Sequence, residues 1–228
     1  MLFYLFDSNF SSPESAVIIF LITIFAFIFS LSLHEFAHAF AAVKMGDETP
    51  KQAGRLTLNP FKHLSIMGFL FFMLCGFGWA KPTPVNPLKF KKYRTGIRWV
   101  SVSGVLTNFL FGLIAAILSA VLRATVGVPG EAMQYVYLAL DSLMWVNSFL
   151  VLFNILPIYP SDGFTFISTF MTSNNKFLQF SIKNAMKILL AVILTSIFID
   201  LLFNFDILNW YLTILYNYVY LPITFIGV

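Results

Sequence analysis

The sequence has few charged residues and a single cysteine. Only 11% of its 228 residues are charged, whereas a soluble domain carries about a quarter. Hydrophobic residues make up 59% of the chain. A chain of this composition cannot cover itself with polar groups, which excludes a soluble globular domain and predicts that lipid solvates it. Cys75 stands alone, which excludes an intramolecular disulfide and a zinc site built from cysteines.

The cations of the chain are gathered in three groups. They lie at residues 44–62, 81–98 and 176–187, and only Arg123 lies elsewhere. Clustering on selected loops is the positive-inside pattern, so we expect these loops to face the cytoplasm. The basic runs are expected to contact anionic lipid head groups. No aromatic stacking pattern accompanies them, so no nucleic-acid partner is expected.

Long apolar runs predict an all-α, polytopic membrane protein. About five transmembrane helices are expected, near residues 15–45, 96–124, 131–156, 184–203 and 208–228. Residues 65–80 are short for a span and lie between two basic loops. A re-entrant or β-hairpin-like membrane segment keeps both loops on the cytoplasmic side. We expect one integral membrane domain over residues 1–228, with a catalytic core at about 15–170 and C-terminal helices at about 184–228.

The motif HEFAH, residues 34–38, lies at the end of the first apolar run. Positions i and i+4 share one face of a helix, so His34 and His38 can bind one metal ion. HExxH on a helix is typical of zinc proteases, in which Glu35 would take a proton from water. Ionisable residues inside a membrane cost roughly 2–3 kcal/mol each, so function is favoured over two histidines satisfied only by backbone carbonyls.

A catalytic zinc site needs a third protein ligand. Asp162 is favoured because it follows the helix break at Pro157 and Pro160, at the depth expected for HEFAH. His63, in a basic loop, and Asp141, near the outer end of its span, are the alternatives. A plain Asp-Gly turn would also account for Asp162.

Five motifs occur in an order that resembles a known family. HEFAH, GRLTLNPFKH, FGWAKPTPVNP, SGVLTN and NILPIYPSDG are similar to motifs of the site-2 protease family of intramembrane zinc metalloproteases. The closest resemblance is to its small prokaryotic members that lack a PDZ domain, and it covers about residues 30–165. It implies one Zn²⁺ per chain bound by His34, His38 and Asp162, with Glu35 as general base.

The resemblance implies further site residues. Asn108 would face the site, where it is a candidate oxyanion donor, and Asn154 and Pro157 would lie near the metal and the substrate. Ser161 stands where the family usually has leucine, and we expect its hydroxyl to bond the Asp162 carboxylate. The family cuts transmembrane segments or signal-peptide remnants of membrane-bound substrates, near the cytoplasmic face of the cell membrane. Extended segments near residues 55–58 and 84–87 are expected to pair with an unwound substrate.

Two other functions accommodate histidines inside a membrane. A zinc transporter or sensor predicts ligands along a path through the bilayer, but the second, fourth and fifth expected spans carry no polar series. An inactive scaffold that binds membrane helices does not require the intact His-Glu-His-Asp set. The sequence leaves the substrate and the oligomeric state open.

Overall fold

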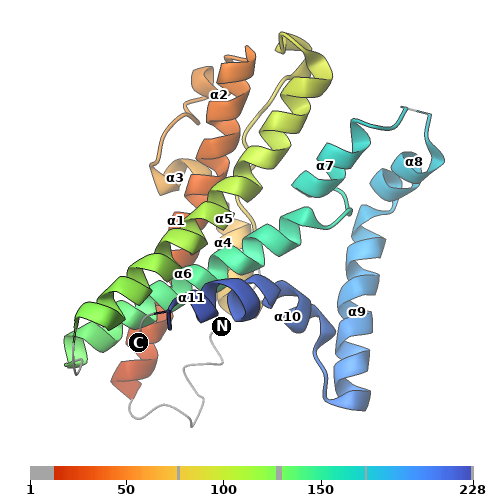
Figure 1. Ribbon diagram of the computed structural model, residues 1–228. Coiled ribbons are helices and arrows are strands. Elements are labelled where there is room, and N and C mark those ends of the chain that lie inside the picture. The colour runs from red at the N-terminus through yellow and green to blue at the C-terminus, as the bar shows by residue number, and fades with distance from the viewer. Residues whose placement is uncertain (1–12, 76–77, 127–129, 173, 227–228) are drawn as a thin grey trace.

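The computed structural model describes residues 13–75, 78–126, 130–172 and 174–226, and these residues are helical without a named strand. Four helices in this part of the chain are long and apolar enough to cross a membrane. They are α1 (Pro13–Met45), α5 (Tyr93–Thr125), α6 (Glu131–Ile155) and α9 (Ala185–Phe203) (Figure 1). The expected all-α class is confirmed for the described residues, with four candidate spans where about five were expected.

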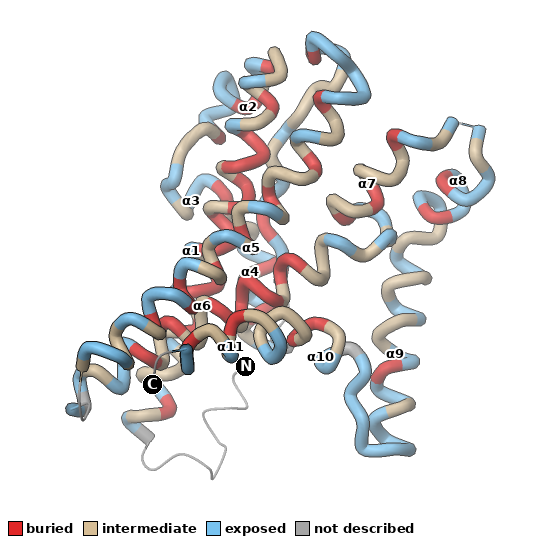
Figure 2. Tube along the Cα trace, viewed as in Figure 1, coloured by how far each residue is buried: buried red, intermediate tan, exposed pale blue. Residues whose placement is uncertain are grey.

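Helices α1, α5 and α6 pack together as the core. Figure 2 shows the buried positions concentrated along them. Small side chains mark their contacts, among them Ala39, Ala116 and Ser119, which are fully buried. Helices in lipid gain little from the hydrophobic effect between them, so small residues favour association by letting the backbones approach closely.

The last apolar run differs from the expected fifth span. The described part of residues 208–228 forms α10 (Ile207–Leu212), the π-helical η3 (Tyr216–Tyr220) and α11 (Leu221–Ile223) in place of one long helix. Ser148 of α6 bonds both sides of the first break: its hydroxyl donates to Leu212 O at 3.1 Å and accepts from Tyr216 N at 3.0 Å. A full crossing by this run stays a prediction, and residues 227–228 lie outside the described part.

The segment between the two basic loops turns back on itself. Its helix α4 (Ile66–Cys75) begins just after Leu64, and Leu64 forms an antiparallel bridge with Ala80. A Cβ atom on Gly68 would lie 2.0 Å from Trp79 O, so glycine is needed where the returning chain crosses the helix. The segment starts and ends side by side, as a re-entrant segment requires; its depth in a membrane stays a prediction.

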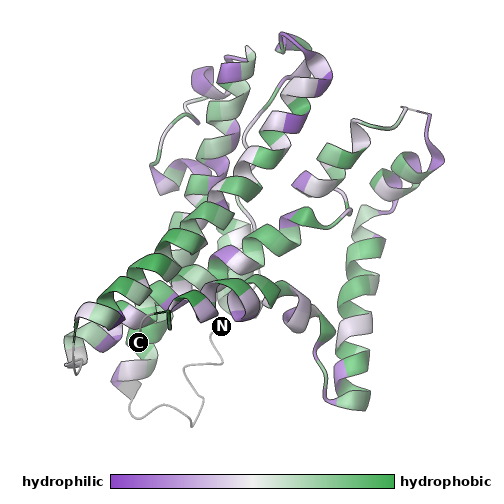
Figure 3. Ribbon diagram, viewed as in Figure 1, coloured by the Kyte–Doolittle hydropathy of each residue, from purple (hydrophilic) through white to green (hydrophobic). Residues whose placement is uncertain are grey.

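Short elements cap the basic end of the core. These are α2 (Thr49–Gln52), α3 (Pro60–His63) and η2 (Pro87–Lys89). Residues 55–58, expected to be extended, form no strand. Residues 81–86 run without helix from Ala80 to η2, and we call them the strap. Hydrophilic residues gather at this end and near α8 (Lys176–Lys183), and hydrophobic ones along the long helices (Figure 3).

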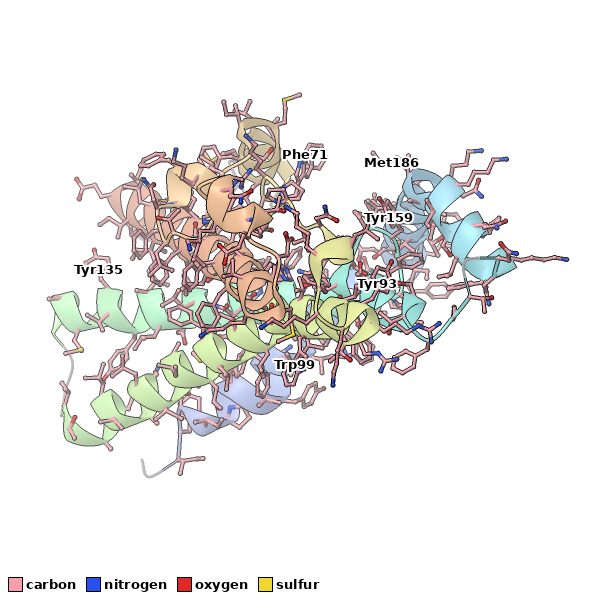
Figure 4. The ribbon with its side chains drawn as sticks, turned by 90° about the horizontal axis from the view of Figure 1, so that it is seen from above. Phe71, Tyr93, Trp99, Tyr135, Tyr159 and Met186 are labelled. Atoms are coloured by element: carbon pink, nitrogen blue, oxygen red, sulfur yellow. The ribbon has the colours of Figure 1, made fainter. Side chains whose placement is uncertain are left out.

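The next three helices form an arm that leaves the core through α7 (Asp162–Ser168), and its α8 and α9 stand apart from the core (Figure 1). We use this name for α7, α8 and α9. Only 6% of the apolar window of α9 is buried, against 44% for α6. Viewed from above, Met186 of α9 and Tyr135 of α6 lie at opposite sides of the molecule (Figure 4).

Candidate metal centre

HEFAH and the Asp-Gly motif meet at the basic end of the core. His34 and His38 project from α1, and Asp162 is the first residue of α7. The Nε2 atoms of His34 and His38 are 2.9 Å apart, and each of them lies 3.3 Å from Asp162 Oδ2. Within the described residues this is the one group of three or more His, Cys, Asp or Glu side chains whose ligand atoms lie within 4.8 Å of one another.

The outer nitrogens of both histidines are already bonded. His34 Nδ1 lies 2.6 Å from Asn108 Oδ1, and His38 Nδ1 lies 2.8 Å from Val100 O. Both partners are acceptors, so each Nδ1 donates a proton and each neutral Nε2 presents a lone pair to the centre. This is the arrangement in which a metal-binding histidine is oriented from behind.

The donor set fits a zinc ion. Asp162 Oδ2 is buried without a hydrogen-bond partner, although it faces both imidazoles at 3.3 Å. Two nitrogen lone pairs and a carboxylate oxygen repel one another unless a cation lies among them. Two histidines and one carboxylate, with one position left for water, form a ligand set that catalytic zinc sites use.

Gly104 lets α5 pass close to the histidines. A Cβ atom there would lie 2.6 Å from His34 Cε1 and 2.6 Å from His38 Nε2, inside van der Waals contact. Any larger residue would push α5 away from α1 or displace the imidazoles. The glycine of the SGVLTN motif is thus explained by the space that the metal centre occupies.

Glu35 is held by the strap. Its Oε2 accepts a hydrogen bond from Thr83 N at 2.8 Å, and Thr83 Oγ1 donates to Glu35 O at 3.1 Å. Glu35 is 8% exposed. The sequence did not predict a role for Thr83, because a hydrogen bond from a backbone N–H requires no particular side chain.

A cavity of about 410 Å³ adjoins the centre. The predicted residues Glu35 and Asn154 line it together with the three metal-group residues. Most of its other walls are apolar, including Trp79 beside the strap, Phe149 and Phe153 of α6, and Leu189 of α9. The cavity therefore lies between the core, the strap and the arm.

Two predicted residues serve the backbone around Asp162. Pro157 follows Leu156, the residue that caps the C-terminal end of α6, and it is not among the residues that line the cavity. The Ser161 hydroxyl caps α7 by accepting from Phe164 N at 3.1 Å, and it donates to Leu156 O. It does not bond the Asp162 carboxylate as expected, because the cap uses the hydroxyl.

The alternative third ligands lie elsewhere. His63 is 1% exposed, and its Nε2 bonds Thr57 O at 2.8 Å. Asp141 lies on α6 beyond the reach of the metal group. Neither places a ligand atom within 4.8 Å of those of both His34 and His38. Asp162 is therefore the acid that the fold brings to the two histidines.

Asn108 lies behind His34 and does not line the cavity. It is 1% exposed, and its Nδ2 donates to Ser30 O at 3.3 Å and to Asn147 Oδ1 at 2.7 Å. Both amide protons are therefore in use, and the contacts favour a positioning role over the oxyanion role, which stays a prediction. Asn147 was missed in the sequence, although an amide in an apolar span is a signal that could have singled it out.

Two curated proteins resemble the chain in sequence. "Putative zinc metalloprotease YwhC" of Bacillus subtilis (strain 168) is 41% identical over 144 residues, which are 61% of this chain and 64% of that protein. "Putative zinc metalloprotease Rip2" of Mycolicibacterium smegmatis is 31% identical over 160 residues, 67% of this chain and 58% of that protein. The chain thus spans less than two thirds of either relative. No family model and no solved structure matches it. The chain is nevertheless a homologue of these two bacterial proteins, and both of their names as zinc metalloproteases agree with the resemblance that its motifs show.

Proposed function

We propose that the protein is a zinc-dependent intramembrane endopeptidase that cuts membrane-bound protein substrates within or near their transmembrane segments. The observation that carries this proposal is the buried group of His34, His38 and Asp162, which adjoins Glu35 in one cavity at the end of a candidate span. The two similar proteins, named as zinc metalloproteases, support it.

His34, His38 and Asp162 would hold the ion, one per chain. Bound zinc lowers the pKa of water to about 7 and polarises a carbonyl group. His34 Nδ1 and His38 Nδ1 are fixed by Asn108 and Val100. Each imidazole is therefore oriented before the ion binds, which reduces the ordering cost of binding.

Glu35 would act as the general base and then as the general acid. Its carboxylate takes a proton from the attacking water as the water oxygen bonds to the scissile carbonyl carbon. It then gives that proton to the leaving amine when the C–N bond breaks. The Thr83 N–H holds one carboxylate oxygen at 2.8 Å, which fixes the direction of the group.

The substrate would have to unwind at the cleavage site, because a helical carbonyl is already bonded to the amide four residues on. The strap runs alongside the cavity through Pro82, Thr83 and Val85. An unwound substrate could add to it by β-augmentation. Pro82 and Pro84 have no N–H, so pairing would rest on the carbonyl groups of the strap and on Val85 N–H.

We place the centre near the cytoplasmic side of the cell membrane. HEFAH lies at the end of α1 from which the basic residues 44–62 follow. The second basic group begins in the strap at Lys81 and continues after it, and the third lies on α8 and at the start of α9. Positive-inside placement of these loops puts the site at the cytoplasmic boundary.

The test compares three purified proteins: the wild type, Glu35→Gln and Glu48→Gln. Glu48 is an exposed carboxylate paired with Lys51, so Glu48→Gln is a matched change away from the site. Zinc per chain is measured by metal analysis, and cleavage is measured on a panel of single-span bacterial membrane proteins in liposomes.

We expect about one zinc in all three proteins and a loss of cleavage in Glu35→Gln alone, by roughly 10²–10⁴-fold. A well-folded wild type without zinc would overturn the proposal. Substantial cleavage by Glu35→Gln would remove Glu35 from the mechanism. Zinc flux through liposomes without cleavage would favour a transporter.

A further inference from the structure

Two asparagines are buried side by side within the core formed by α1, α5 and α6. Asn108 of α5 is 1% exposed and Asn147 of α6 is 0% exposed. An amide in this environment is costly unless all its polar atoms find partners. The Asn147 amide contacts neither the metal group nor the cavity. Its presence is therefore explained only by what it does to its neighbours.

The orientation of the Asn147 amide is fixed by a backbone carbonyl. Its Nδ2 donates to Leu143 O at 2.8 Å and to Ser30 Oγ at 2.9 Å. A carbonyl can only accept, so the opposite amide orientation would place two oxygens against each other. The Asn147 Oδ1 must consequently face Asn108, whose Nδ2 lies 2.7 Å away.

The same reasoning fixes Asn108 and then His34. Asn108 Nδ2 faces Asn147 Oδ1 and the carbonyl of Ser30, which are both acceptors. Its Oδ1 is therefore turned to His34 Nδ1, at 2.6 Å. An amide oxygen has no proton to give, so Nδ1 carries the proton and Nε2 carries the lone pair.

We propose that Asn147 is a positioning residue that sets the tautomer of His34 through Asn108, and so presents the His34 Nε2 lone pair to the metal. The relay runs from α6 through α5 to α1, and it makes a metal ligand depend on the packing of all three core helices. The inference rests on the proposed function, because it assigns Asn147 a role at that same centre.

The two histidines differ in how their tautomers are fixed. His38 Nδ1 donates directly to a backbone carbonyl, Val100 O, which no substitution removes. His34 depends on two side chains in series. Replacing Asn147 with an apolar residue leaves only the longer bond to Ser30 O, at 3.3 Å, to hold the Asn108 amide. An amide that rotates would donate to Nδ1 and place the proton on Nε2. Zinc would then have to compete with that proton for His34.

The experiment uses the full-length protein in detergent micelles. Asn147→Leu, Asn108→Leu and the double variant are compared with the wild type. Zinc affinity is measured by competition with a chromogenic chelator. The ¹⁵N chemical shifts of the His34 ring in the zinc-free protein report its tautomer. Ser148→Ala is the matched control, because Ser148 is 0% exposed, follows Asn147 on α6 and bonds only to the C-terminal segment.

Loss of an outer-shell partner typically lowers metal affinity by about 10–100-fold, and we expect Asn108→Leu to fall in that range. Asn147→Leu should weaken zinc binding by up to about tenfold and give a mixture of His34 tautomers. Because Asn147 acts through Asn108, the double variant should bind zinc no more weakly than Asn108→Leu. Ser148→Ala should lower thermal stability and leave zinc affinity and the tautomer unchanged.

Unchanged affinity and a single tautomer in Asn147→Leu would overturn the inference, and so would additive losses in the double variant. If Asn147→Leu does not fold, Asn147→Ala provides the test, since it removes the same Oδ1 acceptor from Asn108 Nδ2 with a smaller side chain. It should shift the tautomer in the same direction, and no shift would overturn the inference. A wild type that binds no zinc would count against the proposed function, whereas a zinc-binding wild type with an unaffected Asn147→Leu counts against the relay alone.

Discussion

The core and the arm contribute to the centre in different ways. The core supplies His34, Glu35 and His38 from one 33-residue helix, and hydrogen bonds to α5 fix both imidazoles. The arm supplies Asp162 from a helix of seven residues that leads on to the largely unburied α9. The histidine side of the site is therefore built into the packed helices, whereas the carboxylate side depends on how a short helix is docked.

Contacts at both of its ends dock that short helix. Arg98 of α5 donates from Nε to Thr169 Oγ1 at 2.8 Å, and its guanidinium lies 4.0 Å above the Phe170 ring. At the other end, a Cβ atom on Gly163 would lie 2.2 Å from Ile155 O, so the backbones of α6 and α7 touch there. The position of Asp162 thus rests on the junction with α6 at one end and on Arg98 at the other.

Removing the carboxylate should have the largest effect. Asp162→Ala leaves two ligands, so zinc affinity should fall by more than the roughly 10–100-fold typical of outer-shell changes. Zinc per chain after dialysis measures this loss. Asp200→Ala removes an exposed carboxylate from the same arm and should keep about one zinc. Full zinc content in Asp162→Ala would exclude Asp162 as the third ligand.

Stability should separate the core from the arm. Met144 of α6 is 0% exposed in a cluster with Ala116 of α5, whereas Leu194 of α9 is 57% exposed. Met144→Ala leaves a cavity and should cost about 2–5 kcal/mol. Leu194→Ala changes a side chain at the surface and should stay within about 0.5 kcal/mol. Unfolding in mixed micelles measures both, and equal losses would show that α9 packs as firmly as the core.

Loosening the arm should weaken zinc binding without unfolding the core. Arg98→Ala removes one hydrogen bond and one cation–π contact, worth about 1–2 kcal/mol together. We expect faster hydrogen exchange at residues 162–169 and a several-fold loss of zinc affinity. Arg94→Ala, an exposed neighbour in the first turn of α5, is the control. If zinc affinity in Arg98→Ala equals that of the control, Arg98 does not position Asp162.

The strap should show the smallest effect, as a pH dependence. Asp47 accepts from Thr49 N at 3.0 Å and from Asn86 N at 2.6 Å. Burial raises the pKa of Asp47, but these bonds and the charge of Lys89 outweigh it, so its pKa lies below the ordinary value. Its contribution to stability is therefore full above the unfolded pKa of about 3.9, and it is lost as the pH falls through the lower folded pKa.

Asp47→Asn isolates that contribution. At neutral pH it should cost about 1 kcal/mol, because one of the two accepted bonds is lost. The difference from the wild type should shrink as the pH falls from about 4 through the lower folded pKa, because the unfolded chain is protonated first and folded Asp47 only below that. Thermal unfolding at several pH values measures this. A difference that does not change with pH would mean that the charge of Asp47 does not anchor the strap.

The sequence was most informative where it places ionisable residues in an apolar run, because such residues are costly to insert in a membrane. Two histidines and a glutamate at the end of an apolar run predicted a metal group, and the fold brings His34, His38 and Asp162 together. The last apolar run was harder to interpret. Its composition suits a span, but Ser148 and the buried Tyr220, whose hydroxyl donates to Phe109 O at 3.0 Å, draw it into short helices against the core.

The sequence by itself determined three properties: a composition suited to lipid, the helical class and the types of the metal-binding residues. Each of them follows from hydropathy, charge placement or i, i+4 spacing, which are properties of neighbouring residues. Only the tertiary structure decided how these residues are held. The Thr83 bond to Glu35 joins residues 48 positions apart, and the Asn147 bond to Ser30 joins residues 117 apart. Contacts over such separations depend on how the helices pack, and a local pattern does not encode them.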